Sequence, residues 1–200
     1  MGLKLTKTWD KASAITQSMA ARFRAAADQA MLREGHLLRG KIVQNITSGG
    51  ALAGKPFAPL SANTLAVRRF VGFGGTKILM RTGSLRNSVT VRKVGAVTFV
   101  GILRQSRGKG GTSMANIGEI HEYGAGPFSV MMTPRQRRFL MAALGSLGAA
   151  SPGKGGGVLT IKIPARPFMG PVFERFAKPK DVRKRFWDHV ARAMNGDLGK

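Results

Sequence analysis

The chain has 200 residues and carries 33 lysines and arginines against 9 acidic residues, a formal net charge of +24. Hydrophobic residues make up 43% of it, which excludes a wholly disordered tail, and the lack of cysteine excludes a disulfide framework and a cysteine-based zinc site. A compact body with this charge repels itself, so we expect an anionic partner: nucleic acid first, acidic faces of other subunits second and anionic lipid third.

The first quarter of the chain predicts a long amphipathic helix from about Thr8 to Ile46. Gly35 and Gly40 each cost about 1 kcal/mol relative to alanine inside a helix. A bend or break near residues 35–40 therefore fits the pattern, as do two helices in series. The apolar residues recur at spacings of three and four, as on one helix face: Ala12, Ile15, Met19, Phe23, Ala26 and Ala30.

No stretch reaches the ~18 consecutive apolar residues that a membrane span requires. Asp10 and Lys11 interrupt the N-terminus where a signal peptide carries its apolar segment. We therefore expect no membrane contact and no secretion by that route.

The middle of the chain predicts a loop, a short helix and a β-hairpin. Glycines and prolines from Ser48 to Pro59 predict the loop, and Ser61 begins a helix that continues to about Arg69. Branched and aromatic residues over 89–102 predict a hairpin that turns near residues 95–96. The basic, glycine-rich residues 104–113 predict a mobile loop that would order on assembly.

The C-terminal part predicts a helix, a strand and further helices. Thr133 and Pro134 begin a helix that ends near Gly148, residues 153–157 form a flexible connection, and residues 158–163 alternate as in a strand. Apolar residues over 172–194 indicate one or two closing helices.

The predicted fold is α+β, a small antiparallel β-sheet flanked by a long N-terminal helix and C-terminal helices, with long loops. We expect three parts: an N-terminal helical arm over 1–47, an α+β domain over 48–177 and a basic C-terminal helix over 178–200.

A glycine-rich segment, residues 148–155, matches the P-loop spacing up to Lys154. However, glycine stands where a P-loop has its magnesium-binding serine or threonine, and the segment follows a helix instead of a strand. It is therefore not predicted to bind nucleotide.

The histidines and acids form no visible catalytic or metal-binding cluster. Only His121 stands beside a carboxylate, Glu122, and a buried or interface-bonded histidine is more common than a catalytic one. We expect no enzyme, no catalytic residue, no metal and no cofactor. A nuclease or cell-wall hydrolase stays as an alternative, which metal-dependent cleavage of DNA would revive.

Basic residues gather in three clusters on loops or helix faces. No zinc finger, basic zipper or RNA-binding signature accompanies them, so they would contact phosphates and not bases. The clusters are Arg104, Arg107 and Lys109; Arg135, Arg137 and Arg138; and Lys178, Lys180, Arg183, Lys184 and Arg185. Every residue in them except Arg185 is a candidate DNA-phosphate contact.

Three segments occur in a recognisable order: residues 79–89 (LMRTGSLRNSV), 117–124 (IGEIHEYG) and 163–170 (IPARPFMG). Together they resemble the virion morphogenesis, or tail-completion, proteins of Mu-like and related tailed phages. Residues 59–65 (PLSANTL) resemble the segment that precedes them, so the resemblance covers roughly residues 55–177. The basic loop at 104–113 and the helix with its glycine-rich tail at 133–157 depart from the family pattern.

Physically, these segments fit subunit-interface or fold-anchoring roles. Gly83 can take a positive φ in a capped turn or short helix that feeds a strand. A buried Tyr123 would find a hydrogen-bond partner, Arg166 can bind carboxylates bidentately, and Phe168 suits an interface or, at least as well, the core. The candidate residues are Arg81, Gly83, Leu85, His121, Glu122, Tyr123, Gly124, Arg166 and Phe168.

The resemblance implies a structural virion protein of the phage neck that forms an oligomeric ring, completes the tail and joins it to the DNA-filled head. Residues 48–177 would then be the tail-completion or neck domain. The expected partners are copies of the chain, other neck, connector and tail proteins, and the DNA backbone; the protein would be made in the host cytoplasm and reside in the virion. The alternatives are a tail terminator that caps the tail tube, or a sequence-independent DNA-binding protein.

Overall fold

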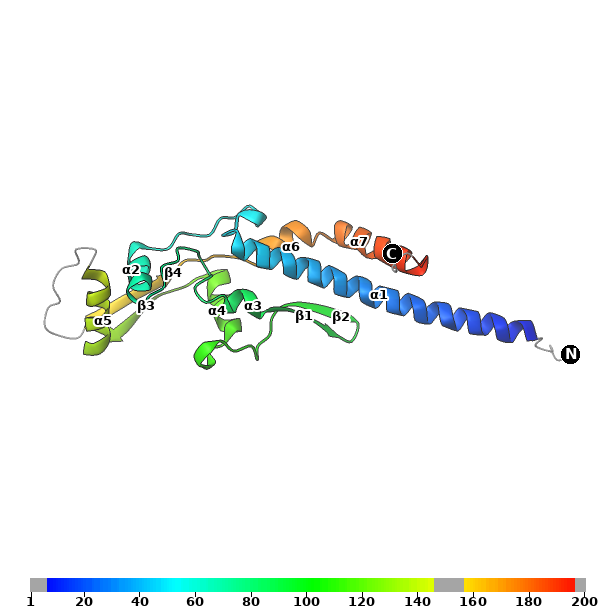
Figure 1. The fold of residues 1–200 in the computed structure, drawn as a ribbon, viewed down its shortest axis with the longest axis horizontal. Helices are drawn as coiled ribbons and strands as arrows, with labels where there is room; N and C mark the ends of the chain where they lie inside the picture. The colour runs from blue at the N-terminus through cyan, green and yellow to red at the C-terminus, as the bar shows by residue number, and fades with distance from the viewer. Residues whose placement is uncertain (1–6, 146–156, 197–200) are drawn as a thin grey trace.

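The computed structural model of the protein describes residues 7–145 and 157–196, the first four of them by backbone alone. The molecule is elongated along one continuous helix, α1 (Lys7–Thr47, 41 residues), which is about 60 Å long at 1.5 Å per residue (Figure 1). The long N-terminal helix is thus confirmed as a single helix, and neither Gly35 nor Gly40 interrupts it.

Gly35 lies where a β-hairpin packs on α1. The hairpin consists of β1 (Val89–Val94) and β2 (Val97–Ile102), paired antiparallel as predicted. A Cβ atom at Gly35 would lie 2.8 Å from side-chain carbons of both Val91 and Thr98, whereas a Cβ at Gly40 would meet nothing within 4 Å. Gly35 therefore permits the close approach of the hairpin. At Gly40 no neighbouring group requires the absence of a side chain.

This contrast predicts opposite effects for two alanine substitutions. Gly40→Ala should raise the Tm by about 2–4 °C, because alanine is favoured over glycine by ~1 kcal/mol in a helix. Gly35→Ala should lower the Tm, because overpacking costs about 1–3 kcal/mol and exceeds that gain. Thermal melts followed by circular dichroism compare the two variants, and a rise in both would mean that the hairpin yields without cost.

The remaining elements are mostly short. Ser61 accepts a hydrogen bond from the Thr64 backbone N–H at the start of α2, and Thr133 with Gln136 forms a capping box at the start of α5, as expected for these helix starts. The elements are α2 (Ala62–Phe70), α3 (Ser84–Ser88), α4 (Met114–Tyr123), β3 (Ala125–Met132), α5 (Pro134–Leu144), β4 (Gly157–Ile163), α6 (Gly170–Phe176), α7 (Pro179–Met194) and the 3₁₀ turns η1 (Ala51–Ala53) and η2 (Lys109–Gly111).

The α+β class is confirmed, but the strands of the described residues form two separate two-stranded sheets instead of one. β3 pairs antiparallel with β4, and this ribbon, with α5 at its end, points away from α1 (Figure 1). Neither β3 nor α4 was predicted from the sequence. Pro127 weakens the strand signal in β3, and the N-cap Ser113 is the one local sign of α4.

Residues 104–113 fold back on themselves between β2 and α4. The Gly108 N–H donates to the Thr112 carbonyl at 2.8 Å, and Arg107 forms a β-bridge with Ser113. The predicted mobile loop thus has internal backbone bonds already in the single chain. The predicted end of the helix near Gly148, most of the glycine connection and the P-loop-like segment lie outside the described residues.

The main core lies where the C-terminal half of α1 meets α3, β1 and α6. Asn45 of α1 is fully buried there; its side-chain amide donates to the Phe168 carbonyl, and its oxygen accepts from the Ala53 N–H. A buried polar group is costly when it is unpaired, so breaking these bonds would destabilise the fold. They therefore hold η1 and the segment before α6 against α1. The buried core residues are Ile42, Ile46, Phe57, Leu85, Val89, Phe168 and Val172.

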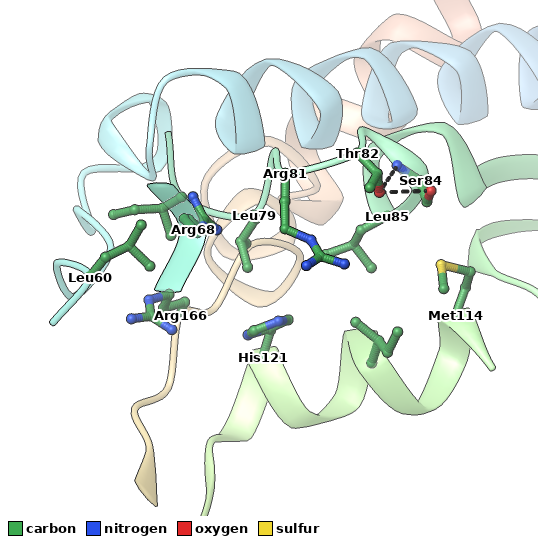
Figure 2. A pocket seen from close by; sticks show the side chains of 12 residues that line it. Leu60, Arg68, Leu79, Arg81, Thr82, Ser84, Leu85, Met114, His121 and Arg166 are labelled. Carbon is green, nitrogen blue, oxygen red and sulfur yellow. Dashed lines mark hydrogen bonds between the residues drawn. The ribbon is translucent and has the colours of Figure 1, made fainter. Parts of the chain in front are cut away.

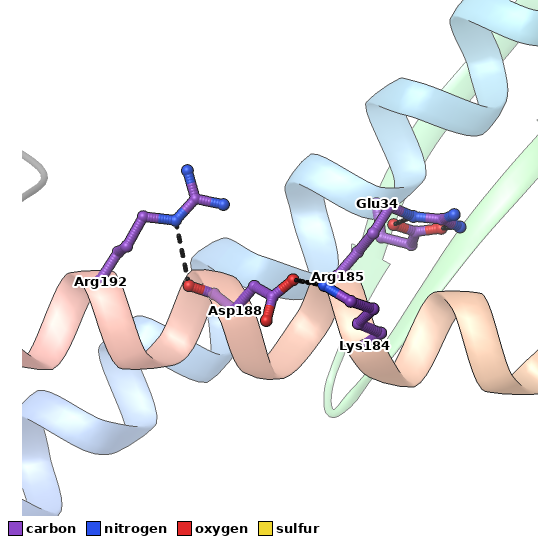
Figure 3. A network of polar contacts seen from close by, with 5 residues as sticks. All are labelled: Glu34, Lys184, Arg185, Asp188 and Arg192. Carbon is purple, nitrogen blue, oxygen red and sulfur yellow. Dashed lines mark hydrogen bonds and ion pairs between the residues drawn. The ribbon is translucent and has the colours of Figure 1, made fainter.

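α7 packs along α1 through a second, smaller core and an ion pair (Figure 3). The buried Glu34 of α1 accepts both bonds of the Arg185 guanidinium fork, which also donates to the Phe176 carbonyl. The hydrogen bond to Glu34 raises the pKa of Arg185 despite its partial burial. Arg185 therefore holds α6, α7 and α1 together and is not a free surface cation.

Candidate functional site

The three segments of the sequence pattern meet at one place in the fold. The first supplies α3, the second the end of α4, and the third the link from β4 to α6. Arg81, His121 and Arg166, one from each segment, line a common pocket (Figure 2).

Glu122 ties the second segment to the third. Its carboxylate accepts the backbone N–H groups of Phe168 and Met169 at 2.9 and 3.1 Å and that of Gly170 at 2.7 Å. A Cβ atom at Gly170 would lie 2.9 Å from a Glu122 oxygen, so glycine keeps the carboxylate close. None of these bonds involves the adjacent His121, and the role of Glu122 is to anchor the fold.

Arg166 also anchors the fold, but with carbonyl partners. Its guanidinium donates to the Ala58 and Pro59 carbonyls at 2.8 and 3.1 Å, and its backbone N–H donates to the His121 carbonyl. The carboxylate partner that the arginine fork suggested does not occur among the described residues. Phe168, in the same segment, is fully buried in the core.

The two glycines of the candidate set both adopt a positive φ, which favours glycine over other residues. Gly83 has φ 72° at the start of α3, and Leu85 of that helix is buried in the core. Gly124 has φ 80°, and a Cβ there would lie 3.0 Å from the Ala165 nitrogen and the Ile163 carbonyl oxygen. Both positions are strained for other residues.

Tyr123 contradicts the expectation of a buried, hydrogen-bonded tyrosine. Its side chain is 79% exposed, and it forms no hydrogen bond with the part of the chain that the structure describes. Backbone contacts hold the junction between α4 and β3, and the Tyr123 side chain takes no part in them. Its ring is therefore exposed to solvent and accessible to another molecule.

The pocket between these elements has a volume of about 260 Å³ and three arginines on its wall, Arg68, Arg81 and Arg166. Burial, and then the charge of Arg81, lower the pKa of Arg68; burial, and then Arg68, lower that of Arg166. The directions agree with like charges held together without an acid between them. No aspartate or glutamate is among the described residues that line the pocket.

His121 forms part of the same wall. Its Nδ1 atom is buried and has no hydrogen-bond partner among the described groups. Burial, and then the charge of Arg166, lower its pKa, so the ring is neutral near pH 7. In the neutral ring one nitrogen is a donor and the other an acceptor, according to the tautomer.

Arg68 is the pocket residue that sequence reasoning did not single out. It lies in the last turn of α2 and donates to the Gly75 and Lys77 carbonyls, which holds the glycine-rich turn after the helix. The segment that resembles the family pattern before the first motif ends at residue 65. The only local signal for Arg68 is that a basic residue lies near a helix end, and many helices have such a residue.

The three basic clusters lie in different parts of the molecule. The first occupies the loop before α4, the second the α5 end of the β3–β4 ribbon, and the third the first turns of α7 (Figure 1). Arg107 donates to the carbonyls of Arg104 and Ser106, and Lys184 pairs with Asp188. The structure thus does not bring the clusters together within one subunit. Exposed side chains include those of Arg104, Lys109, Arg135, Arg138, Lys178, Lys180 and Arg183.

A second feature is an uncovered apolar stripe on the N-terminal part of α1. Ile15, Met19 and Phe23, four residues apart, are 59%, 52% and 40% exposed. The same stripe continues to Ala26 and Ala30, which α7 buries. The Phe23 ring still lies beside Trp187 of α7, with 6.2 Å between the ring centroids. Figure 1 shows that α1 extends past the end of α7, so the stripe has less cover toward the N-terminus.

Neither a metal cluster nor a membrane span is found in the described ranges. No group of three or more histidine, cysteine or acidic side chains there could hold a metal ion. None of the helices in these ranges combines the length and apolar character needed to cross a bilayer.

Comparison with known proteins gives one match. The model of the phage virion morphogenesis family matches residues 7–176, which include α1, the core and all three segments around the pocket. No curated protein and no solved structure gives a match.

Proposed function

Because the chain belongs to the phage virion morphogenesis family, we propose that it is a structural subunit of the phage neck. On this proposal it assembles with copies of itself into a ring, completes the tail and joins the tail to the DNA-filled head. It acts by binding and not by turnover, and its place is the neck or tail region of the virion.

The observation that carries this proposal is the exposed apolar stripe of Ile15 and Met19, which continues from Phe23 beside Trp187 of α7. Burial of such side chains stabilises by about 1.5–3 kcal/mol each, and the adjacent residues Ala26 and Ala30 of the same stripe are already buried by α7. A neighbouring helix that continued the packing of α7 would cover the rest. The stripe therefore supports an assembly role.

A ring of identical subunits needs two different complementary faces on each subunit. The stripe lies in the N-terminal part of α1, whereas the pocket is lined by residues of α2, α3 and α4, which lie toward the C-terminal end of that helix (Figure 1). The stripe offers one such face, and the pocket, which lies apart from it, stays available to a different protein. The exposed basic clusters would approach DNA phosphates in the channel of such a ring.

The first experiment deletes the protein from the producing phage and images the lysate by negative-stain electron microscopy. Separate DNA-filled heads and tails are expected for a joining role. Abnormally long tails would indicate a tail terminator instead. Normal infectious virions would contradict the assembly role and favour sequence-independent DNA binding.

Plasmid complementation of the deletion tests the stripe itself. Wild-type protein should restore joined virions, whereas Met19→Lys should not, because it places a charge in the apolar stripe. Gln17→Lys is the matched control: it adds the same charge to the same arm on another exposed helix face. Equal restoration by both variants would mean that the stripe is not an assembly surface.

A further inference from the structure

The pocket at the junction of the three segments holds positive charge that no described acid balances. The charged side chains Arg68, Arg81 and Arg166 line it together with the neutral His121 (Figure 2). Like charges held this close repel one another at a cost to the folded chain. An anion in the pocket would remove that cost.

The arginines keep donors for such an anion. Arg166 uses its Nε and one terminal nitrogen for the Ala58 and Pro59 carbonyls, and Arg68 uses one terminal nitrogen for carbonyls of the turn after α2. Arg81 forms no hydrogen bond with the described residues and only stacks near the Phe73 ring, 4.9 Å from its centroid. Its whole guanidinium fork is available.

The rest of the pocket wall is largely apolar. Leu60, Leu79 and Ile117 contribute apolar side chains beside the cations. Polar groups of Thr82, Ser84 and His121 complete the wall. A ligand that fits this lining has a charged oxygen pair at one end and hydrocarbon next to it. A glutamate or aspartate side chain in a peptide has this form, and an arginine fork binds carboxylates bidentately.

We propose that the pocket binds a carboxylate side chain of an acidic segment in a neighbouring virion protein, an inference that rests on the assembly role proposed above. The partner is a different protein, because this chain has few acids to offer its copies. Glu122 is used within the fold, and four other carboxylates are already in ion pairs: Asp28, Glu34, Glu174 and Asp188.

A DNA phosphate fits the pocket less well. The phosphates of a duplex repeat along an exposed polar ribbon, and proteins bind them with cations on open surfaces. The three basic clusters on the loop before α4, on α5 and on α7 offer such cations outside the pocket. The recess and its apolar wall favour a side chain that enters from a protein.

Calorimetric titration of the full chain tests this proposal. The probe is a short acetylated peptide with two glutamates between leucines, at about 0.15 M salt, where the Debye length is about 8 Å. The wild type should bind it, and a glutamine version of the peptide should not bind. Arg81→Gln should weaken binding about tenfold or more, the loss of one charge-assisted bond.

Arg92→Gln is the matched control, because it removes the same charge from the exposed face of β1, outside the pocket. It should leave the affinity within about twofold, as for a remote, exposed charge. Arg81→Lys keeps the charge without the fork and should bind with intermediate affinity. Thermal melts check that the variants fold.

Equal weakening by Arg92→Gln, or equal binding of the glutamine peptide, would overturn the proposal. The proposal would also be overturned if Arg81→Gln weakened the binding of a short DNA duplex but not that of the peptide. The pocket would then bind phosphate. The titration measures the pocket alone, whereas failure of the assembly role would appear as normal virions from the deleted phage.

Discussion

Glu122→Gln is expected to lower the free energy of unfolding by about 3 kcal/mol, because a carboxylate with three backbone donors loses its charge and one of its acceptors. Gln keeps the size of the side chain, but its amide nitrogen cannot accept from the Phe168, Met169 or Gly170 N–H groups. At least one of these donors is left without a partner. The start of α6 would then detach from the end of α4.

Urea titration at neutral pH measures this loss. Glu119→Gln is the control, since Glu119 lies on the same helix, is exposed and forms no bond with the described residues. It should change stability by no more than about 0.5 kcal/mol. If the two variants unfolded at the same urea concentration, the three backbone bonds would not hold the site together.

Phe168→Ala should cost about 3–5 kcal/mol, the usual range for a fully buried phenylalanine. The ring is 0% exposed and packs in the cluster of Ile42, Leu85 and Val172, which joins α1, α3 and α6. Its removal opens a cavity where these elements meet. Differential scanning calorimetry would record the lower Tm.

Phe128→Ala is the comparison for Phe168. Phe128 is 42% exposed on β3, so its removal should cost about 1 kcal/mol or less. A similar loss at both positions would contradict the placement of Phe168 at the centre of the core. It would also reopen the interface role for that side chain.

Local sequence signals predicted most of the helices and the first hairpin. The spacing of apolar residues marks α1 and α7, and the residues around Ser61 and Thr133 mark helix starts by their side-chain caps. β3 carries no such signal, because its residues are mostly exposed and include Pro127. α4 has the Ser113 N-cap as its one local signal, and its packing against α3 and β2 supplies the rest.

The sequence predicted three residues of the candidate site but not their bonding partners or the fourth residue, Arg68. The order of the three segments pointed to Arg81, His121 and Arg166, which the fold does bring together. The carbonyl partners of Arg166 and the third cation, Arg68, lie about a hundred positions away in the sequence. No short-range pattern records such contacts, and the exposure of Tyr123 likewise depends on how β3 leaves α4.

The β3–β4 ribbon departs from the pocket at Gly124 and returns to it at Ala165, and a Cβ at Gly124 would lie 3.0 Å from the Ala165 nitrogen. The far end of the ribbon, where Met132 pairs with Gly157, points away from the site. Residues gained or lost at that far end would leave the bonds of Glu122 and Arg166 in place. The far end of the ribbon can thus accept a change in length without disturbing the two roots, where Gly124 meets Ala165.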